Sequence, residues 1–282
     1  MSDVKAENKF ASRDRAALLR ARKRRRLVIT LRIAFIVVML GGWEITARTK
    51  LVDSFFFSMP SEVAGQVWSW AVEGTAQGSL WEQIWVTLSE TLMGFILGVV
   101  SGVFFGILLG RNALLADVFS VFIKIANSIP RVVLGSIFII TLGLGTPSKV
   151  ALAFVMVFFV VFANAFQGVR EADRDLIANA RILGASPRRV TISVVLPSAL
   201  TWIIASLHVS FGFALVGAVV GEFLGARKGI GLMIATAQGT FNAAGVFASM
   251  LILAIVALAM EYLITALENI LIKWRPAPLA EN

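Results

Sequence analysis

The sequence predicts an all-α, polytopic membrane protein with six transmembrane helices, and three observations support this fold class. Hydrophobic residues make up 58% of the 282 residues and charged residues only 15%, whereas an average globular chain holds about 25% charged residues. Several apolar stretches exceed the roughly 18 residues that indicate a transmembrane helix. The chain has no cysteine and one histidine, which excludes disulfides and the thiolate or histidine clusters that bind metals. We therefore expect a membrane protein without a metal or other cofactor.

The basic N-terminal tail, residues 1–26, carries most of the net charge of +9. It holds ten Lys and Arg residues against three acids and directly precedes the first apolar run. Positive charge at this place keeps a segment on the cytoplasmic side and attracts anionic membrane lipid; nucleic-acid binding is the disfavoured alternative. Cleavage as a signal peptide is a second alternative, but residues 27–43 lack a clear small-x-small cleavage site. We expect an uncleaved first helix.

Apolar windows of about 20 residues predict the six membrane spans. With a cytoplasmic N-terminus, nineteen Lys and Arg residues face the cytoplasm and five the opposite side, with Lys124 and Arg131 set aside as intramembrane. This balance places both termini in the cytoplasm, residues 173–196 inside and the loop 48–83 outside. The membrane domain then comprises residues 27–282. Its predicted spans are 28–47, 84–109, 118–143, 149–168, 197–221 and 246–272.

Five glycines recur at a spacing of four in the second predicted span, and all fall close to one helix face. Lipid tails give helices no hydrophobic reason to associate, so a face of small residues permits the close backbone approach that stabilises helix packing. We expect this face to meet another helix of the chain; a homodimer contact and a sliding surface in a transport cycle are the alternatives. The five residues are Gly94, Gly98, Gly102, Gly106 and Gly110.

Residues 173–197 predict a compact helix-turn-helix between the fourth and fifth spans. Asp173 or Asp175 can cap a first short helix, and Ser186 can cap a second. Between them, Gly184 fits the C-terminal stop of the first helix. Such a structured polar segment indicates a docking element. DNA binding is disfavoured, because a loop anchored to two spans cannot easily enter a major groove.

The sequence of this segment closely resembles a family motif. Leu183-Gly184-Ala185-Ser186, followed after nine residues by Leu196-Pro197, is similar to the cytoplasmic loop of permease subunits in binding-protein-dependent ATP-binding-cassette (ABC) importers. The family's Glu-Ala-Ala is replaced here by Ala178-Asn179-Ala180, so the glutamate is missing. Stretches at 59–63, 108–111, 129–130, 143–145 and 221–225 are similar to the nitrate/sulfonate/taurine branch, and the resemblance covers roughly residues 55–275.

The resemblance implies a type I (MetI-like) importer permease in a bacterial inner membrane. It also implies three kinds of partner: a second, identical or related permease subunit, a separate ATPase that receives the loop, and an extracytoplasmic solute-binding protein. The chain contains no G-x-x-x-x-G-K-[ST] phosphate-binding motif, so the partner ATPase binds the ATP and this chain is not itself an enzyme. The residues implied for coupling are Asp175, Leu176, Ala180, Leu183, Gly184, Ala185, Ser186, Leu196 and Pro197.

Four intramembrane polar residues are candidates for the substrate path, because such residues are costly in lipid unless they have a role. Each has a simpler alternative. Arg131 can snorkel to the interface, Asn164 can bond to a neighbouring helix, His208 can be a hydrogen-bonded packing residue, and Glu222 can be a solvated or capping residue. Pro130 and Arg131 together favour an anionic solute, because a helix N-terminus and a positive charge both attract anions.

Two other function classes compete with the permease. A stand-alone ion-coupled carrier needs ionisable groups near the midplane, for which His208 is the only plausible candidate. A membrane-embedded hydrolase needs a nucleophile with a base or metal ligands, and His208 has no evident carboxylate partner in its own helix. We favour the permease.

Overall fold

The computed structural model describes the backbone of residues 2–271 and most side chains from residue 22 onward. Met1 and residues 272–282 lie outside the described residues, including Lys273, Arg275 and the last residue of the predicted sixth span. The side chains of the tail up to residue 21 lie outside them as well. The chain divides into two compact units, Met1–Ala64 and Gly65–Asn282.

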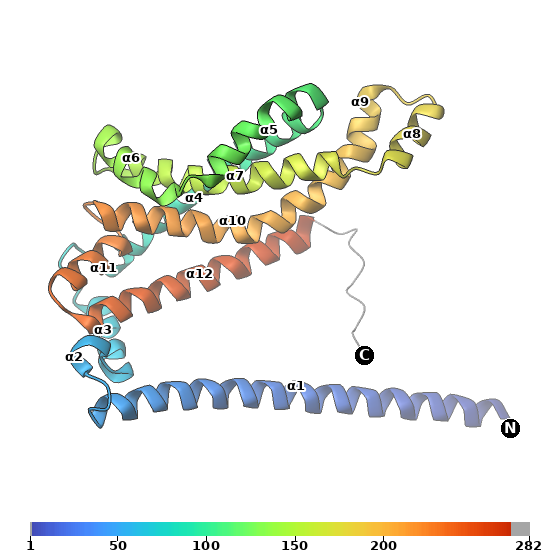
Figure 1. The fold of residues 1–282 in the computed structure, drawn as a ribbon. Helices are drawn as coiled ribbons and strands as arrows, with labels where there is room; N and C mark the ends of the chain where they lie inside the picture. The colour runs from blue at the N-terminus through green and yellow to red at the C-terminus, as the bar shows by residue number, and fades with distance from the viewer. Residues whose placement is uncertain (1, 272–282) are drawn as a thin grey trace. The chain divides into compact units, whose positions relative to one another are not determined.

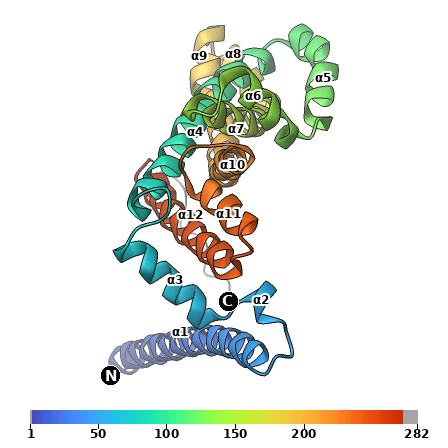
Figure 2. The same cartoon turned by 90° about the vertical axis from the view of Figure 1, so that its left-hand side faces the viewer.

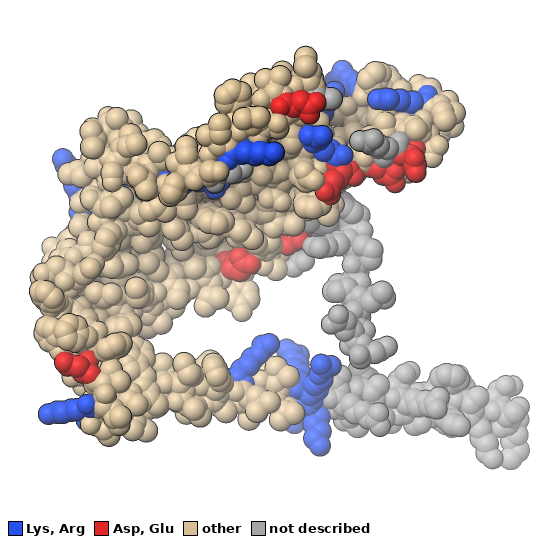
Figure 3. Space-filling model, viewed as in Figure 1, with Lys and Arg blue, Asp and Glu red and all other residues tan. Residues whose placement is uncertain are grey.

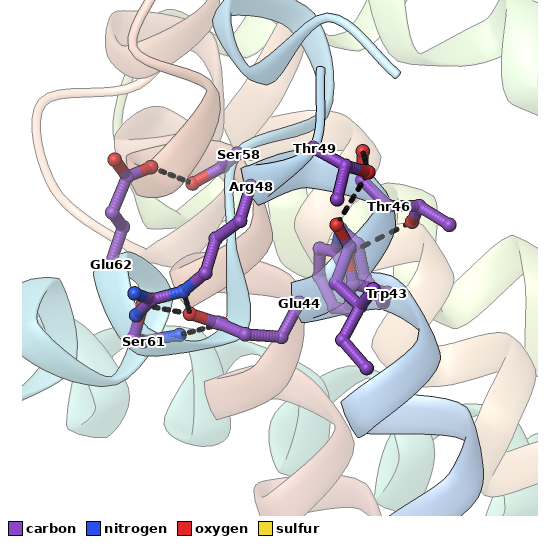
Figure 4. A network of polar contacts seen from close by, with 9 residues as sticks. Trp43, Glu44, Thr46, Arg48, Thr49, Ser58, Ser61 and Glu62 are labelled. Atoms are coloured by element: carbon purple, nitrogen blue, oxygen red, sulfur yellow. Dashed lines mark hydrogen bonds and ion pairs between the residues drawn. The ribbon is translucent and has the colours of Figure 1, made fainter. Parts of the chain in front are cut away.

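The first unit is built on one long helix. α1 (Ser2–Arg48) joins the basic tail and the first predicted span without a break, and a short helix α2 (Ser54–Phe57) follows it. Blue side chains gather in Figure 3 where the described part of α1 begins, in the basic stretch of residues 22–26. At the other end of α1, the Glu44 carboxylate accepts from the Ser61 backbone N–H at 3.0 Å and from the Ser61 hydroxyl at 2.8 Å. The Arg48 guanidinium lies 2.7 Å from the same carboxylate. Figure 4 shows these contacts, which connect the end of α1 to Ser61 across the turn that follows it.

The second unit is a helical bundle in which α4, α7 and α10 pack against one another. Figures 1 and 2 show α12 beside α10 and α11, and α5 and α6 on the other side of the bundle. Five helices of the described chain are long and apolar enough to cross a membrane, and two shorter apolar helices accompany them. The elements are α3 (Pro60–Val72), α4 (Leu80–Gly110), α5 (Ala113–Ser128), α6 (Leu134–Leu142), α7 (Thr146–Arg170), α8 (Arg174–Ile182), α9 (Pro187–Val190), α10 (Leu196–Leu224), α11 (Ile230–Gly239) and α12 (Ala243–Leu271).

The third predicted span, 118–143, is wrong as a single helix. It is split into α5, a 3-10 turn (Arg131–Val133) and α6. Ile129 has the extended backbone, with φ −77° and ψ 127°, that a residue before proline prefers, and Pro130 has no N–H to continue the helix. The break places Arg131 at a corner between two helices.

The fifth span begins earlier than predicted, because α9 continues into α10. A π-helical turn (Thr191–Val195) joins them into one helix from Pro187 to Leu224. Pro197 lies in the first turn of α10, where its missing N–H would leave one carbonyl without a helical partner. A π-helical turn is a usual way to accommodate such a disruption. The second short helix of the predicted helix-turn-helix is therefore the first turn of the span itself.

Candidate functional site

The five glycines of α4 lie against α7, so their face packs inside this chain. A Cβ atom on Gly98 would lie 2.7 Å from the Val157 side chain, and one on Gly106 would lie 2.6 Å from the Ala165 Cβ. At Gly102 the nearest atoms include the backbone of α7, 3.0 Å away. The facing residues on α7 also recur at a spacing of four: Ala153, Val157, Val161, Ala165 and Val169.

Three buried side chains cap the N-terminus of α11, a helix that the sequence analysis did not predict. Gln83 Oε1 accepts from the Gly229 N–H at 2.8 Å, and Thr87 Oγ1 accepts from the Ile230 N–H at 2.8 Å. Glu222 Oε2 accepts from the next N–H, that of Gly231, at 2.6 Å. These amides would otherwise have no partner within the helix, and the helix dipole favours a carboxylate beside them.

Glu222 is fully buried, so the expectation of a solvated position is wrong, whereas its capping role is observed. Its carboxylate also accepts from the Thr87 hydroxyl at 3.0 Å. Lys149 of α7 and Glu90 of α4 are further buried members of this polar group. The Lys149 ammonium donates to the Leu144 carbonyl at 2.8 Å. Polar groups buried in a bundle need hydrogen-bond partners, and the bonds of Gln83, Thr87 and Glu222 join α4, α10 and α11.

The α8–α9 segment, residues 173–190, extends beyond the end of α7 (Figure 1). Asp173 is the N-cap of α8, and its carboxylate accepts from the Asp175 N–H at 2.8 Å. Gly184 has φ +80°, a left-handed conformation that glycine adopts without strain. Ser186 caps α9, and Pro187 follows in its first turn. The tip of the segment carries exposed apolar side chains: Ile182 and Leu183 are 82% and 86% exposed.

The other predicted path residues each have different partners. The Arg131 guanidinium lies 5.0 Å from the centre of the Phe159 ring of α7, a cation–π contact. The Asn164 amide donates to the Val160 carbonyl of its own helix at 2.9 Å. His208 of α10 lies between two carboxylates of α12, Glu261 and Glu268.

Comparison with known proteins identifies the family. Residues 98–274, more than half of the chain, match the family described as the binding-protein-dependent transport system inner membrane component. The chain belongs to this family. It is therefore the permease subunit of an ABC importer, a multi-pass inner-membrane protein that works with an ATPase and a solute-binding protein. It is a transport protein, not an enzyme, and family membership disfavours a stand-alone carrier. The family's permeases bind no cofactor, since the ATPase binds the ATP.

Individual relatives support the same family. The permease is 30% identical over 239 residues to the riboflavin transport system permease protein RibX of Chloroflexus aurantiacus, covering 85% of this chain and 88% of the relative. It is 28% identical to the taurine transport system permease protein TauC of Escherichia coli, covering 87% and 90% of the two chains. A structure of the MetNI methionine ABC transporter in an inward-facing conformation matches with a TM-score of 0.55, 22% identity and coverage of 69% and 94%. This last likeness shows the MetI-like fold.

Sequence reasoning missed Gln83, Thr87, Glu90 and Lys149, all of which contribute to the buried polar group. The available signal was their position: Glu90 lies inside an apolar span, where an ionisable residue requires a partner. Glu261 and Glu268 were missed for a similar reason, because their partner His208 is more than 50 residues away in the sequence. Such pairs become visible only when the helices are placed side by side.

Proposed function

We propose that the permease receives the movement of its ATPase through the α8–α9 segment. The exposed side chains of Leu176 in the first turn of α8 and of Ile182 and Leu183 at the tip carry this proposal, because exposed apolar residues in a polar segment indicate a surface that a partner covers. Exposed arginines at 181, 188 and 189 lie in the same segment and can form the polar rim of an interface. This chain has Ala178 where the family motif has a glutamate, so it lacks that polar contact. Its apolar side chains must therefore supply more of the contact with the ATPase.

The continuity of α9 with α10 supports a mechanical role for the segment. Local caps at Asp173 and Ser186 and the left-handed Gly184 fix the shape of the segment without help from the rest of the bundle. Because α9 and α10 form one helix from Pro187 to Leu224, displacement of the docked segment is transmitted directly into a membrane span. Closure of the ATPase would then move α10 within the bundle.

The topology proposed from the charge balance fits this arrangement. Both termini and the α8–α9 segment lie on the cytoplasmic side, and the solute-binding protein docks on the opposite side. The basic tail, residues 1–26, contacts anionic lipid, and residues 27–282 form the transport domain. We further propose that two copies of this chain form the permease dimer and enclose the path.

For the solute, we propose a small organic anion such as a sulfonate. Arg131 supports this class, because it places a positive charge at the break between α5 and α6, next to the Phe159 ring. The likeness to a taurine permease is consistent with a sulfonate. The relative named for riboflavin transport shows that the family also serves larger, different solutes, so the residue-level argument rests on Arg131.

Replacing Leu183 with Asp tests the docking surface. We expect the variant permease to insert and purify normally, while ATP hydrolysis stimulated by the loaded binding protein falls about tenfold, because each buried apolar contact contributes roughly 1.5–3 kcal/mol. Glu171→Gln, an exposed change near the segment, is the matched control. Wild-type stimulation in Leu183→Asp would refute the docking proposal.

Replacing Arg131 tests the solute class. The measurement is ATP-driven uptake of labelled taurine and of ethanesulfonate by proteoliposomes that hold the permease, its ATPase and its binding protein. Uptake should fall about tenfold in Arg131→Gln and only partly in Arg131→Lys, because lysine keeps the charge but not the planar fork of arginine. Equal uptake by Arg131→Gln and the wild type would remove the argument for an anion.

A further inference from the structure

His208 of α10 is held between two carboxylates of α12. Its Nδ1 lies 2.6 Å from Glu261 Oε1, and its Nε2 lies 2.8 Å from Glu268 Oε2. The two glutamates are seven residues apart, two turns of a helix, so they share one face of α12 and lie on either side of the ring. The His208 side chain is 27% exposed, and those of Glu261 and Glu268 are 48% and 18% exposed.

This geometry fixes the number of protons in the group. An ionised carboxylate only accepts hydrogen bonds, so each of the two contacts needs one hydrogen between ring nitrogen and oxygen. A neutral imidazole supplies one of them, and the second must reside either on the ring or on a glutamate. Imidazole is the stronger base by about two pKa units in water. The second proton therefore belongs on His208, which gives an imidazolium between two carboxylates and a net charge of −1.

The positions of Glu261 and Glu268 along α12 show which part of this helix the contacts of His208 hold. The buried residues of α12, such as Ala248 and Ile252, lie in its N-terminal half, where the helix packs on α11. Beyond Leu258, none of the described side chains of α12 is fully buried, and Tyr262 and Leu263 are 77% and 52% exposed. The contacts of His208 thus attach a half-helix that has little apolar packing of its own.

We propose that His208 is a positioning residue whose doubly protonated ring ties the C-terminal half of α12 to α10. Charge-assisted hydrogen bonds on both sides of one ring are stronger and more directional than neutral ones. α10 is continuous with the α8–α9 segment, so the tie makes α12 follow the helix that carries the docking surface. This last step rests on the proposed function, whereas the tie itself rests on the observed contacts.

The charge state of the ring is directly measurable, because His208 is the only histidine in the chain. Full-length permease purified through a histidine-free tag and labelled with [15N]histidine in lipid nanodiscs would give one pair of ring nitrogen signals. We expect both nitrogens to show the imidazolium signature at pH 7. The Glu261→Gln and Glu268→Gln double variant should show the neutral pattern at the same pH. A neutral pattern in the wild type would overturn the assignment.

The positioning role is tested by two substitutions in the permease–ATPase complex. His208→Gln removes the positive charge, whereas His208→Arg keeps the charge and offers several donors. We expect amide hydrogen exchange in residues 258–271 to become at least fivefold faster in His208→Gln and to stay within twofold of wild type in His208→Arg. Glu171→Gln is the control. Wild-type exchange in His208→Gln, or equally fast exchange in both variants, would refute a charge-dependent tie.

These measurements distinguish the tie from the docking proposal. The nitrogen signals and the exchange of α12 in the absence of nucleotide depend only on α10 and α12. If Leu183→Asp couples normally while His208 behaves as expected, the docking surface is wrong and the tie stands. If His208 is neutral while Leu183→Asp uncouples ATP hydrolysis, the tie is wrong and the docking surface stands.

Discussion

α8 and α11 are both short helices that connect membrane spans, yet their stabilising contacts come from opposite sources. α8 is capped by Asp173, its immediate neighbour in sequence, and its apolar side chains Ile182 and Leu183 are exposed. α11 is capped by Gln83, Thr87 and Glu222, and its apolar residues Ile230, Met233 and Ala237 are buried. A helix with local caps and an exposed apolar tip is independent of the bundle and suited to a partner. A helix with distant caps and a buried face belongs to the rigid interior.

The largest effect is expected where interior packing is tightest, on the glycine face of α4. A leucine at Gly102 would place its Cβ 3.0 Å from the α7 backbone, and a backbone cannot yield as a flexible side chain does. α4 and α7 should separate, and the yield of assembled complex should fall at least tenfold. Val100→Leu is the matched control, because Val100 is 65% exposed on the same helix. Equal yields from both variants, measured by size-exclusion chromatography, would show that this contact is dispensable.

The buried polar group should give the next largest effect. Glu222→Ala removes the carboxyl group that accepts from the Gly231 N–H and the Thr87 hydroxyl, and each buried polar group left without a partner costs about 1–3 kcal/mol. The melting temperature of the purified permease should fall clearly. Glu222→Gln should fall less, because an amide oxygen still accepts from the Gly231 N–H. Unchanged melting of Glu222→Ala would contradict the view that α11 is held by distant caps, and Glu73→Ala on the surface serves as the control.

The contrast between contacts that are near in sequence and contacts that are distant in sequence explains which features could be predicted. The fold class and the family were predictable, because they depend on the length of apolar stretches and on a contiguous motif, and both are confirmed. The shape of α8 depends on neighbours such as Asp173, so its start could be assigned to one of two aspartates. α11 lies between the predicted spans 197–221 and 246–272 and was not predicted as a helix, because two of its three caps, Gln83 and Thr87, lie more than 140 residues away in α4. Pro130 indicated the helix break at Ile129-Pro130, but the high hydropathy of residues 118–143 led to the prediction of one continuous span.

The contacts of charged residues were the least predictable feature. Glu222 and His208 were visible as polar residues in apolar spans, yet nothing in one sequence indicates that Glu222 bonds to Thr87 and Gly231 or that His208 faces Glu261 and Glu268. Such partners come from different helices, and their pairing depends on helix rotation and depth. The rotation of α4 in turn depends on the glycine face, so the polar contacts follow from the packing.

The smallest effect on stability is expected from substitution of Gly184. This residue lies in the exposed α8–α9 segment, so its substitution tests that segment separately from the interior of the bundle. A side chain in the left-handed region costs about 1–2 kcal/mol, and a β-branched one is strained most. No atom lies within 4 Å of a Cβ placed at Gly184, so any effect of substitution comes from the backbone and not from a clash. Gly184→Asn should be nearly neutral, because asparagine tolerates this conformation, whereas Gly184→Val should lower stimulated ATP hydrolysis severalfold at an almost unchanged melting temperature. If Gly184→Val instead melts as early as Glu222→Ala, the α8–α9 segment is part of the rigid interior, and the distinction between the two connecting helices fails.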